Sequence, residues 1–402
     1  MRRERQLEIL DRIVGHRVGG NTTDMYPDMY FSPTDAYKSP ERYQEELDRI
    51  FRRTPLLVCL SGDVAEPGDF VTLDMMGVPL LVARGEDGKV RAFRNTCQHR
   101  GACVAQGRGK GKRAFSCPYH AWSYRLDGSL IRPTHLDGFR GLDIDEVGLP
   151  AVPCDEAAGL VFVSFAGREQ PEFDARAWLG GSLVDDFESF GYENYQLITT
   201  RSTTRDVNWK IMFDSFCEMY HVQFLHAKTI AHLFRSDCST FDDLGLHGLM
   251  TGVRATIDEL KAQPREEWEL MRHAALNYHI APNTVLIHMI DHVEMYRILP
   301  EGPTRCRAEL SLYAPELPTT ERAERHWARQ AETLINTIET EDMAMADQAQ
   351  FAVDAGNPPV FRFGRNEPAL IHHHEVVEAL LAGEEERFAA RDPKPVRISA
   401  GR

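Results

Sequence analysis

Two short stretches, NTCQHRGACVAQG at residues 95–107 and FSCPYHAWSY at residues 115–124, carry the pattern that decides the fold of this chain. Each stretch holds a closely spaced pair of one cysteine and one histidine, Cys97 with His99 and Cys117 with His120, and the first stretch holds a further cysteine, Cys103. Seventeen residues separate the two pairs. Glycine and proline beside the pairs predict tight turns. The chain therefore offers two thiols and two imidazoles from two turns.

The region around these turns has the texture of an all-β module. From Leu56 to about Phe165, short apolar or alternating runs such as FVTL, VPLLVA and LVFVSF are broken by clusters of Gly, Asp and Pro. Before it, residues 1 to about 50 predict an opening helix and a second helix from Ser39 to Phe51, with Ser39 as N-cap.

Two cysteines and two histidines bind either a tetrahedral structural zinc or a two-iron cluster. Zinc sites of this composition usually take the two cysteines from one turn and the two histidines from another, whereas here each turn supplies one of each. This interleaving favours a [2Fe–2S] cluster. The RGKGK segment at 108–112 lacks the strand-to-helix setting of a phosphate loop, so it is interpreted as a flexible loop.

The two turns resemble the Rieske motif, and Arg100-Gly101 and the YHAW run at 119–122 are similar to its surroundings. The resemblance implies a Rieske [2Fe–2S] cluster held by Cys97, His99, Cys117 and His120. Imidazole ligation raises the reduction potential of such a cluster and makes that potential depend on pH. A cluster of this kind is suited to the transfer of single electrons.

A second candidate metal site lies in NWKIMFDSFCEMYHVQFLHA at residues 208–227. It offers Glu218, His221 and His226. One carboxylate and two histidines are the ligand set of the facial triad that binds non-haem ferrous iron. The two histidines are five positions apart, which separates them by roughly 140° on an ideal helix. We therefore predict a distortion or break of the helix between them.

The same segment is similar to the iron site of Rieske-type non-haem iron oxygenases. The resemblance implies that His221 and His226 bind the iron and that Asp342, within ETEDMAMADQAQ, is the third ligand in preference to Glu341 or Asp347. A solvated helix face is the alternative for Asp342. Asn208, which opens the motif, is counted with the catalytic residues.

The resemblance further implies that Glu218 is a bridge that carries electrons from the neighbouring subunit's Rieske histidine to an iron-site histidine. It stands where the family more often has aspartate. Within the family, glutamate at this place is associated with members that act on quaternary ammonium compounds.

By this resemblance the fold is α+β, with an N-terminal all-β Rieske module and a helix-grip-like catalytic domain whose antiparallel sheet is flanked by helices. A length of 402 residues suits two domains. The expected division is a helical lead-in at 1–50 that packs on the catalytic domain, the Rieske domain at 51–168 and the catalytic iron domain at 169–402. Strands are predicted near 197–205, 284–288, 292–299 and 306–313, and helices near 208–226 and 320–350.

The wall of the substrate pocket is predicted from apolar residues near the iron ligands and on two later strands. These residues, each of which is often simple core, are Phe213, Phe216, Phe224, Leu225, His288, Met289 and Tyr296. If the substrate is a cation, Tyr278, Phe234 and Tyr296 are candidates for an aromatic cage. The HHH run at 372–374 is interpreted as a solvated loop in preference to a third metal site.

Composition limits the partners. The net charge of −15 argues against a nucleic-acid surface. The chain has no apolar run of membrane-spanning length, and its start, MRRERQLEIL, lacks the apolar core of a signal peptide, so we expect a cytoplasmic protein that does not engage a membrane. The eight cysteines are too sparse for a disulfide framework.

Electrons must come from outside the chain, because no dinucleotide-binding fingerprint is present. A separate NAD(P)H-dependent reductase, with or without a ferredoxin, is implied. The resemblance also implies a head-to-tail homotrimer, with or without a small β subunit.

The leading hypothesis is a terminal oxygenase that uses O2 to hydroxylate or dihydroxylate a small aromatic substrate. The alternative has the same two metal centres and the same external electron supply. It acts as a monooxygenase or demethylase on a quaternary ammonium or N-/O-methyl substrate. A third possibility is an electron carrier or a structural zinc protein. Such a protein would need only the two Cys-His pairs, and the motif at 208–227 would remain unexplained.

Overall fold

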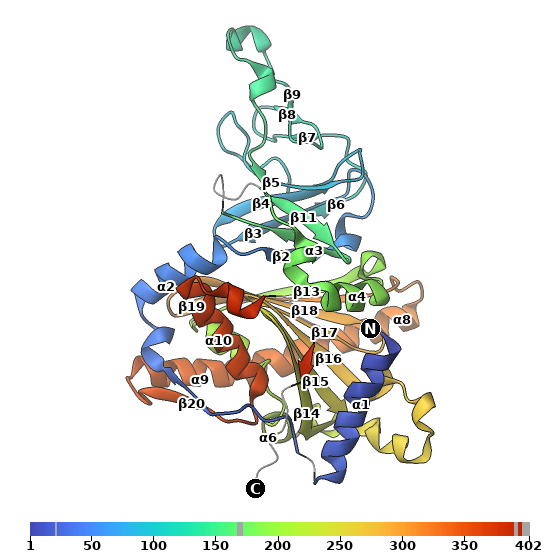
Figure 1. Ribbon diagram of the computed structural model, residues 1–402. Helices are drawn as coiled ribbons and strands as arrows, with labels where there is room; N and C mark the ends of the chain where they lie inside the picture. The colour runs from blue at the N-terminus through green and yellow to red at the C-terminus, as the bar shows by residue number, and fades with distance from the viewer. Residues whose placement is uncertain (21, 167–171, 390–392, 396–402) are drawn as a thin grey trace. The chain divides into compact units, whose positions relative to one another are not determined.

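The computed structural model describes residues 1–20, 22–166, 172–389 and 393–395, and the chain divides into two compact units (Figure 1). The β unit comprises residues 51–178 and 191–196, and the large unit comprises residues 1–50, 179–190 and 197–402. Residues 172–178 and 191–196, which the sequence-based division places in the catalytic domain, cluster with the β unit.

The β unit is built from short strands in three sheets. Their orders are β10-β5-β4-β3-β6, β11-β12-β2 and β7-β8-β9. The strands are β2 (Leu56–Leu60), β3 (Phe70–Met75), β4 (Val78–Arg84), β5 (Val90–Arg94), β6 (Arg108–Gly109), β7 (Phe115–Ser116), β8 (Ser123–Tyr124), β9 (Leu130–Arg132), β10 (Ala151–Val152), β11 (Cys154–Ala157) and β12 (Leu160–Val163). The predicted all-β texture between Leu56 and Phe165 is confirmed.

The large unit contains an eight-stranded sheet in the order β13-β19-β18-β17-β16-β15-β14-β21. From β14 to β19 each strand pairs antiparallel with the next strand in the sequence. Short connections join these pairs as hairpins except β15 and β16, which residues 255–273 separate. The strands are β13 (Gln196–Arg205), β14 (Phe234–Leu244), β15 (His247–Arg254), β16 (Ala274–Ile280), β17 (Thr284–His288), β18 (Val293–Gly302), β19 (Arg305–Ala314) and β21 (Lys394–Pro395). All four strand-like runs predicted for this region are confirmed.

Helices cover this sheet (Figure 1). Helix α10 contacts β14 and β15, whereas α5 contacts β18, β19 and α9. The helices are α1 (Arg3–Val18), α2 (Pro40–Glu46), α3 (Ala175–Leu179), α4 (Gly181–Phe190), α5 (Trp209–Asp214), α6 (Val222–Leu225), α7 (Leu270–His273), α8 (Glu321–Thr337), α9 (Met343–Asp354) and α10 (Pro368–Ala382), and a two-stranded sheet pairs β1 (Tyr30–Pro33) with β20 (Val360–Phe363). In the part of the chain that the structure describes, no helix has the length and apolar character that crossing a bilayer requires.

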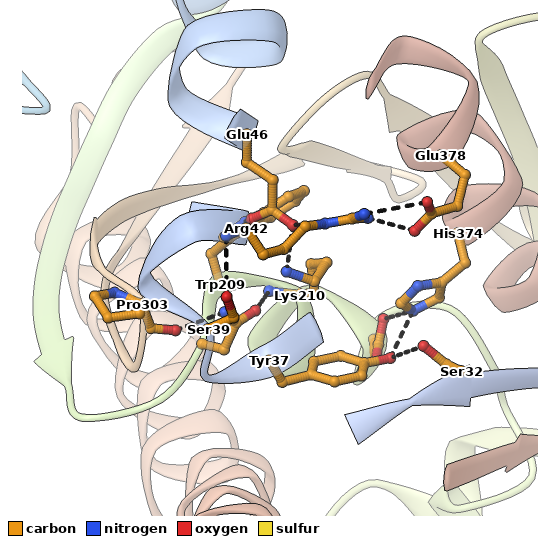
Figure 2. Close-up of polar contacts among 12 residues, drawn as sticks. Ser32, Tyr37, Ser39, Arg42, Glu46, Trp209, Lys210, Pro303, His374 and Glu378 are labelled. Atoms are coloured by element: carbon orange, nitrogen blue, oxygen red, sulfur yellow. Dashed lines mark hydrogen bonds and ion pairs between the residues drawn. The ribbon is translucent and has the colours of Figure 1, made fainter. Parts of the chain in front are cut away.

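A buried ion pair ties the N-terminal segment of the large unit to helix α5 (Figure 2). Lys210 Nζ donates to Glu46 Oε1 at 2.6 Å, and Trp209 Nε1 donates to Glu46 Oε2 at 2.7 Å. The Lys210 and Glu46 side chains are 2% and 1% exposed. Arg42, one turn before Glu46, forms an ion pair with Glu378 of α10. Helices α2, α5 and α10 are thereby held together immediately before the segment that carries Glu218.

The HHH run does not form the predicted solvated loop. His372, His373 and His374 lie in helix α10 and are all buried. His374 Nε2 lies 2.9 Å from Asp214 Oδ1, and His373 stacks on Phe213 with ring centroids 3.9 Å apart. Burial lowers the pKa of His373 well below its ordinary value, so the ring stays neutral. The prediction was wrong because α10 is buried on nearly all sides, and neutral histidine is compatible with such a core.

Candidate metal centres and the adjoining cavity

The two Cys-His turns of the β unit have the same backbone geometry. In each turn the cysteine carbonyl accepts a hydrogen bond from the amide four residues later, Gly101 N at 2.8 Å and Ala121 N at 2.9 Å. Both of these residues have positive φ, +77° and +58° respectively. Glycine adopts this conformation freely, whereas for alanine it costs about 1–2 kcal/mol. The surrounding structure therefore imposes the second turn.

The four predicted cluster residues lie together. Cys97 and Cys117 are free, buried thiols, and the rings of His99 and His120 have centroids 4.5 Å apart. The Nδ1 atoms of both histidines are buried and have no hydrogen-bond partner in the described residues. A buried ring nitrogen without a partner costs free energy, so these atoms fit metal ligation. Two sulfurs and two nitrogens match the donor set of a Rieske cluster.

Aromatic rings hold the two imidazoles in place. His99 stacks on Trp122 with an interplanar angle of 8°, and Tyr119, which is 56% exposed, stacks on His120 with centroids 3.8 Å apart. Tyr124 Oη lies 3.2 Å from Cys97 Sγ. A hydrogen bond to a thiolate ligand is one of the means by which a protein adjusts cluster potential.

In the large unit, the structure brings His221, His226 and Asp342 together. One ligand atom from each lies within 4.8 Å of the others. Asp342 Oδ1 is 3.2 Å from His226 Nε2 and 3.6 Å from His221 Nε2. Two imidazoles and one carboxylate that converge in this way fit a facial triad for ferrous iron.

The backbone around these residues is irregular in two places. Helix α5 ends at Asp214, and α6 spans only four residues, with His221 just before it and His226 just after it. The break lies before His221, at residues 215–221, whereas Leu225 N donates to the His221 carbonyl at 2.8 Å within a helical turn, so the prediction of a break between the two histidines was wrong. Asp342 ends a π-helical turn, Ile338–Asp342, which joins α8 to α9. Such single π turns occur often at functional sites.

The other nitrogen of each histidine faces a second carboxylate. Glu218 Oε1 contacts His221 Nδ1 and its Oε2 accepts the His221 backbone N–H at 3.0 Å, while Glu341 Oε2 contacts His226 Nδ1. Burial acts to lower the pKa of His226, but its contacts with Asp342 and Glu341 outweigh burial and raise it. Carboxylates on Nδ1 leave Nε2 free for a metal.

Sequence reasoning weighed Glu341 as a ligand and did not identify this contact. Its proximity to His226 depends on the π turn, because a regular helix would separate adjacent side chains by about 100°. The sequence carries no clear signal for such a turn.

A cavity of about 330 Å³ adjoins the His221–His226–Asp342 cluster. Of the predicted pocket residues, Phe216, Met289 and Tyr296 line it, and Phe234 lines it as well. The Phe216 and Tyr296 ring centroids are 4.5 Å apart. Further lining residues include Met219, Ile230, Gly252, Arg254, Asn277, Ile287, His292, Glu294, Gln330, Thr333 and Leu334.

One wall of the cavity is charged. Glu294 is 7% exposed, accepts the Tyr296 hydroxyl at 2.6 Å and lies 3.3 Å from His292 Nε2. His292 Nδ1 is 2.7 Å from Asp291. Burial acts to lower the pKa of His292, but Asp291 and Glu294 raise it to about 9. A signal for this wall exists in the sequence, since Glu294 and Tyr296 alternate on one face of β18.

Some predicted pocket residues lie elsewhere. Phe213 packs on His373, and His288 stacks on Phe190 with centroids 3.9 Å apart, where burial lowers its pKa to about 3. Both are buried and neither lines the cavity: His288 points to the opposite face of β17 from the cavity-lining Ile287, and Phe213 packs beside His279 on the cavity side of the sheet. Tyr278, a candidate for the cage, is buried and donates to Asp186 at 3.0 Å.

Asn208 has a structural position. Its side chain accepts the Lys210 backbone N–H as the N-cap of α5 and donates to the Pro303 carbonyl at 2.6 Å. It does not line the cavity. This position follows from its place immediately before the helix.

A second, more open depression of about 650 Å³ lies beside the cluster. Phe224 and Leu225 line this depression instead of the cavity, together with Met345, Phe361, Phe363 and Glu367. Four residues line both spaces: Ser215, Glu218, His221 and Asp342. The bridge candidate Glu218 thus lies between the cavity and a space open to the surface.

Comparison with known protein families covers both units. The family model described as the catalytic domain of the ring-hydroxylating α subunit matches residues 185–383, and the model of the Rieske [2Fe–2S] domain matches residues 54–141. The first match contains the His221–His226–Asp342 cluster, and the second contains the Cys-His turns.

Two curated relatives are monooxygenases. The carnitine monooxygenase oxygenase subunit of Acinetobacter pittii is 31% identical over 48% of this chain and 52% of its own length. The chloroplastic choline monooxygenase of Arabidopsis thaliana is 26% identical over 85% of this chain and 81% of its own length. The chain thus spans about half of the first relative and about four-fifths of the second.

Solved structures share the fold. The quaternary ammonium Rieske monooxygenase CntA in complex with L-carnitine has a TM-score of 0.74 at 21% identity, over 88% of this chain and 96% of that chain. Another structure of CntA is described in terms of inter-subunit electron transfer. Naphthalene 1,2-dioxygenase from Rhodococcus sp. has a TM-score of 0.70 at 17% identity, over 93% of this chain and 98% of that chain.

Proposed function

Because this chain belongs to the family of Rieske-type ring-hydroxylating oxygenase α subunits, we propose that it is the terminal oxygenase that oxidises a small molecule next to a positively charged nitrogen. The observation that carries the proposal is the buried carboxylate of Glu294 on the cavity wall. Glu294 already accepts the Tyr296 hydroxyl and faces His292, which it shares with Asp291, so a cationic substrate would balance its remaining charge and a neutral one would not.

The charges around the cavity support a cationic substrate. A ferrous ion would bring two positive charges, and the three carboxylates on or next to its ligands, Glu218, Glu341 and Asp342, bring three negative ones. Protonated His292 offsets Asp291, so Glu294 adds a further negative charge. The rings of Phe216, Phe234 and Tyr296 offer π faces, which attract cations.

The relatives support the same choice. Both curated relatives named above are monooxygenases, of carnitine and of choline, and the chain has Glu218 where the family more often has aspartate. The likeness to naphthalene 1,2-dioxygenase concerns the fold. We therefore favour the quaternary ammonium alternative over the aromatic substrate that led the sequence analysis.

The reaction balances as a monooxygenation. When bound, the [2Fe–2S] cluster supplies single electrons and the mononuclear iron supplies the site at which O2 reacts. One oxygen atom becomes a hydroxyl on the carbon next to nitrogen and the other leaves as water, with two electrons and two protons consumed. The C–N bond of the hydroxylated carbon then breaks to give an aldehyde and an amine.

The roles of the chain's own residues follow from their contacts. His221, His226 and Asp342 would hold the iron from one side and leave the side toward the cavity open. Glu218 and Glu341 orient the two imidazoles through Nδ1. Apolar residues such as Ile230, Ile287 and Leu334 restrict water around the reacting carbon.

Electrons would reach the iron from the β unit of a second copy of this chain. Glu218 lies between the cavity and the open depression, whose apolar rim includes Phe224 at 72% exposure. His99 and His120, with exposed Tyr119 beside them, form the matching surface of the β unit. A separate reductase would reduce the cluster, and three copies in a ring would satisfy every site.

The proposal is tested by single turnover of dithionite-reduced holoenzyme with O2, which avoids any need for the natural reductase. We expect aldehyde and amine from trimethylammonium probes and little product from naphthalene or benzoate. Glu294→Gln should weaken binding of the cationic probes about 10- to 100-fold. Efficient oxidation of the aromatic probes, with none of the ammonium probes, would overturn the proposal.

The assembly is tested separately by light scattering and rapid kinetics. We expect a mass three times the chain mass of 45.7 kDa. Glu218→Gln should keep this mass and its iron, while substrate-triggered reoxidation of the cluster slows about 10- to 100-fold. Glu367→Gln, in the same depression, is the matched control. A fully active monomer would contradict the assembly.

A further inference from the structure

A small void lies beside the cavity, at the β13 edge of the eight-stranded sheet. Its volume is about 20 Å³. Its wall comes from strands β13, β18 and β19, from α5, and from the helical segment that runs from α8 through the π turn to α9. We call this space the side void. The proposed chemistry gives it no role.

The side void and the cavity share one wall. Phe216, Tyr296 and Ile338 line both spaces. The two aromatic rings are in contact, with centroids 4.5 Å apart. Ile338 begins the π turn that ends at Asp342. A molecule in the side void is therefore separated from the cavity by these three side chains, next to the segment that carries the third proposed iron ligand.

The strand register confirms that the two spaces are neighbours. Tyr296 of β18 pairs with Leu310 of β19, and both residues line the side void. Two positions along the same strands, Glu294 pairs with Leu312, and both of these line the cavity. Alternate residues of a strand point to the same face, at a spacing of about 7 Å. The side void and the cavity thus follow one another along one face of the sheet.

An ion pair covers the outer end of the side void. Arg201 Nε donates to Glu339 Oε1 at 2.9 Å, and Thr203 Oγ1 donates to the same oxygen at 2.6 Å. All three residues line the void. The side chains of Arg201 and Glu339 are 56% and 21% exposed. An ion pair with this exposure contributes little to stability, so it can open without disturbing the core.

The size and the wall of the side void select a small apolar molecule. One water needs about 10–15 Å³, so the void has room for a diatomic gas but not for an organic substrate. The polar groups of its wall already have partners, since Arg201, Thr203 and Glu339 bind one another and the Tyr296 hydroxyl donates to Glu294 at 2.6 Å. A water molecule would gain little there, whereas an apolar gas loses nothing.

We propose that the side void is the entry and holding site for O2, which passes from the exposed ion pair to the shared wall and so into the cavity. The organic substrate is too large for this route and must reach the cavity by another. The proposal goes beyond the proposed function, because it requires an oxygenase but no particular substrate. It gives the apolar space behind the Phe216 and Tyr296 rings a role in supplying the second reactant.

Xenon tests the site directly, because it binds apolar cavities and takes no part in turnover. Crystals of the loaded holoenzyme are placed under xenon pressure, and the anomalous signal is measured. We expect xenon beside Ala308 and Leu310, which both line the side void. Ala308→Leu should fill the void and abolish this signal, whereas Leu310→Ala should enlarge it and strengthen the signal. Opposite changes in two core variants distinguish the site from a general loss of packing.

The O2 route is tested by rapid mixing of reduced holoenzyme with O2 at several concentrations. The enzyme is saturated with the trimethylammonium or the aromatic probe, whichever it oxidises. We expect Ala308→Leu to lower the second-order rate constant for O2 about 10-fold and to leave the affinity for the probe unchanged. Leu310→Ala should not slow the reaction. Ala328→Leu, at an exposed position of α8, is the matched control and should change neither quantity.

Two results would contradict the proposal. The first is wild-type protein without xenon in the side void. The second is an Ala308→Leu variant that excludes xenon but reacts with O2 at the wild-type rate, or that is slowed no more than Leu310→Ala. Failure of the proposed function is distinguishable, because it would change which probe is oxidised but neither the xenon site nor the order of the O2 rate constants.

Discussion

Each histidine of the iron site is held through Nδ1 by a carboxylate that is not itself a proposed ligand. Glu218 holds His221 and Glu341 holds His226, and Thr229 donates to Glu341 at 2.9 Å. Such contacts set the ring orientation and raise the basicity of the coordinating nitrogen. The two carboxylates differ in environment, because Glu218 lines the open depression whereas Glu341 does not.

The substitution Glu341→Gln should loosen the iron without unfolding the protein. Loss of the carboxylate weakens the hold on His226, and such changes typically cost about 10- to 100-fold in metal affinity. Competition with a ferrous chelator measures the affinity for iron. The control is Glu339→Gln, because Glu339 is paired with Arg201. Equal iron retention in the two variants would contradict the role of Glu341.

The His292 imidazole makes stability depend on pH. Its pKa is raised to about 9 from an ordinary 6.5, so its stabilising charge is fully present below pH 6.5 and is lost as the pH rises through 9. The linked change in the free energy of unfolding is on the order of 3 kcal/mol. Urea unfolding at pH 6.5 and 9.5 should show this loss in wild type and a smaller one in His292→Gln. An unchanged difference in the variant would refute the assignment.

Two irregular helical elements assemble the iron site. The four-residue helix α6 turns His221 and His226 toward one point, and the π turn before α9 directs both Glu341 and Asp342 at them. A regular helix continued from α5 through His226 would spread Glu218 and the two histidines around its axis. Packing against the sheet, α5 and the N-terminal segment maintains the irregularity.

The buried pair between Glu46 and Lys210 supports this packing from α2. Glu46→Ala would leave Lys210 buried without its partner, which costs about 3–5 kcal/mol. The control Glu378→Ala removes a carboxylate that is 48% exposed and should cost at most about 1 kcal/mol. Urea unfolding distinguishes them. Similar losses would mean that the buried pair does not stabilise the large unit.

At the scale of the whole molecule, the two proposed metal centres lie in different units and should respond separately. Chelation of the mononuclear iron should lower the thermal transition of the large unit, because ligand binding to the native state stabilises it. The visible absorption of the [2Fe–2S] cluster should persist through the same treatment. Simultaneous loss of both signals would show that the units do not behave independently.

The sequence by itself determined the chemistry of the proposed centres and the class of the fold. Cys97, His99, Cys117 and His120 can be read from two tight turns, because ligands on one turn are separated by one or two residues. Alternating runs of apolar residues predicted the antiparallel sheets, since such patterns depend on local periodicity. The family resemblance supplied Asp342, which no local pattern connects to the distant histidines.

Tertiary structure decided which side chains surround the cavity. Phe213 and His288 look like pocket residues in the sequence but face the core, whereas Glu294 and Arg254 enter the cavity. The HHH run looks solvated in the sequence but is buried in α10. The side of an element that faces a cavity depends on its rotation against neighbours far away in the chain, and no local pattern encodes that rotation. The features that bear on substrate choice therefore emerged only when the sheet and its helices were assembled.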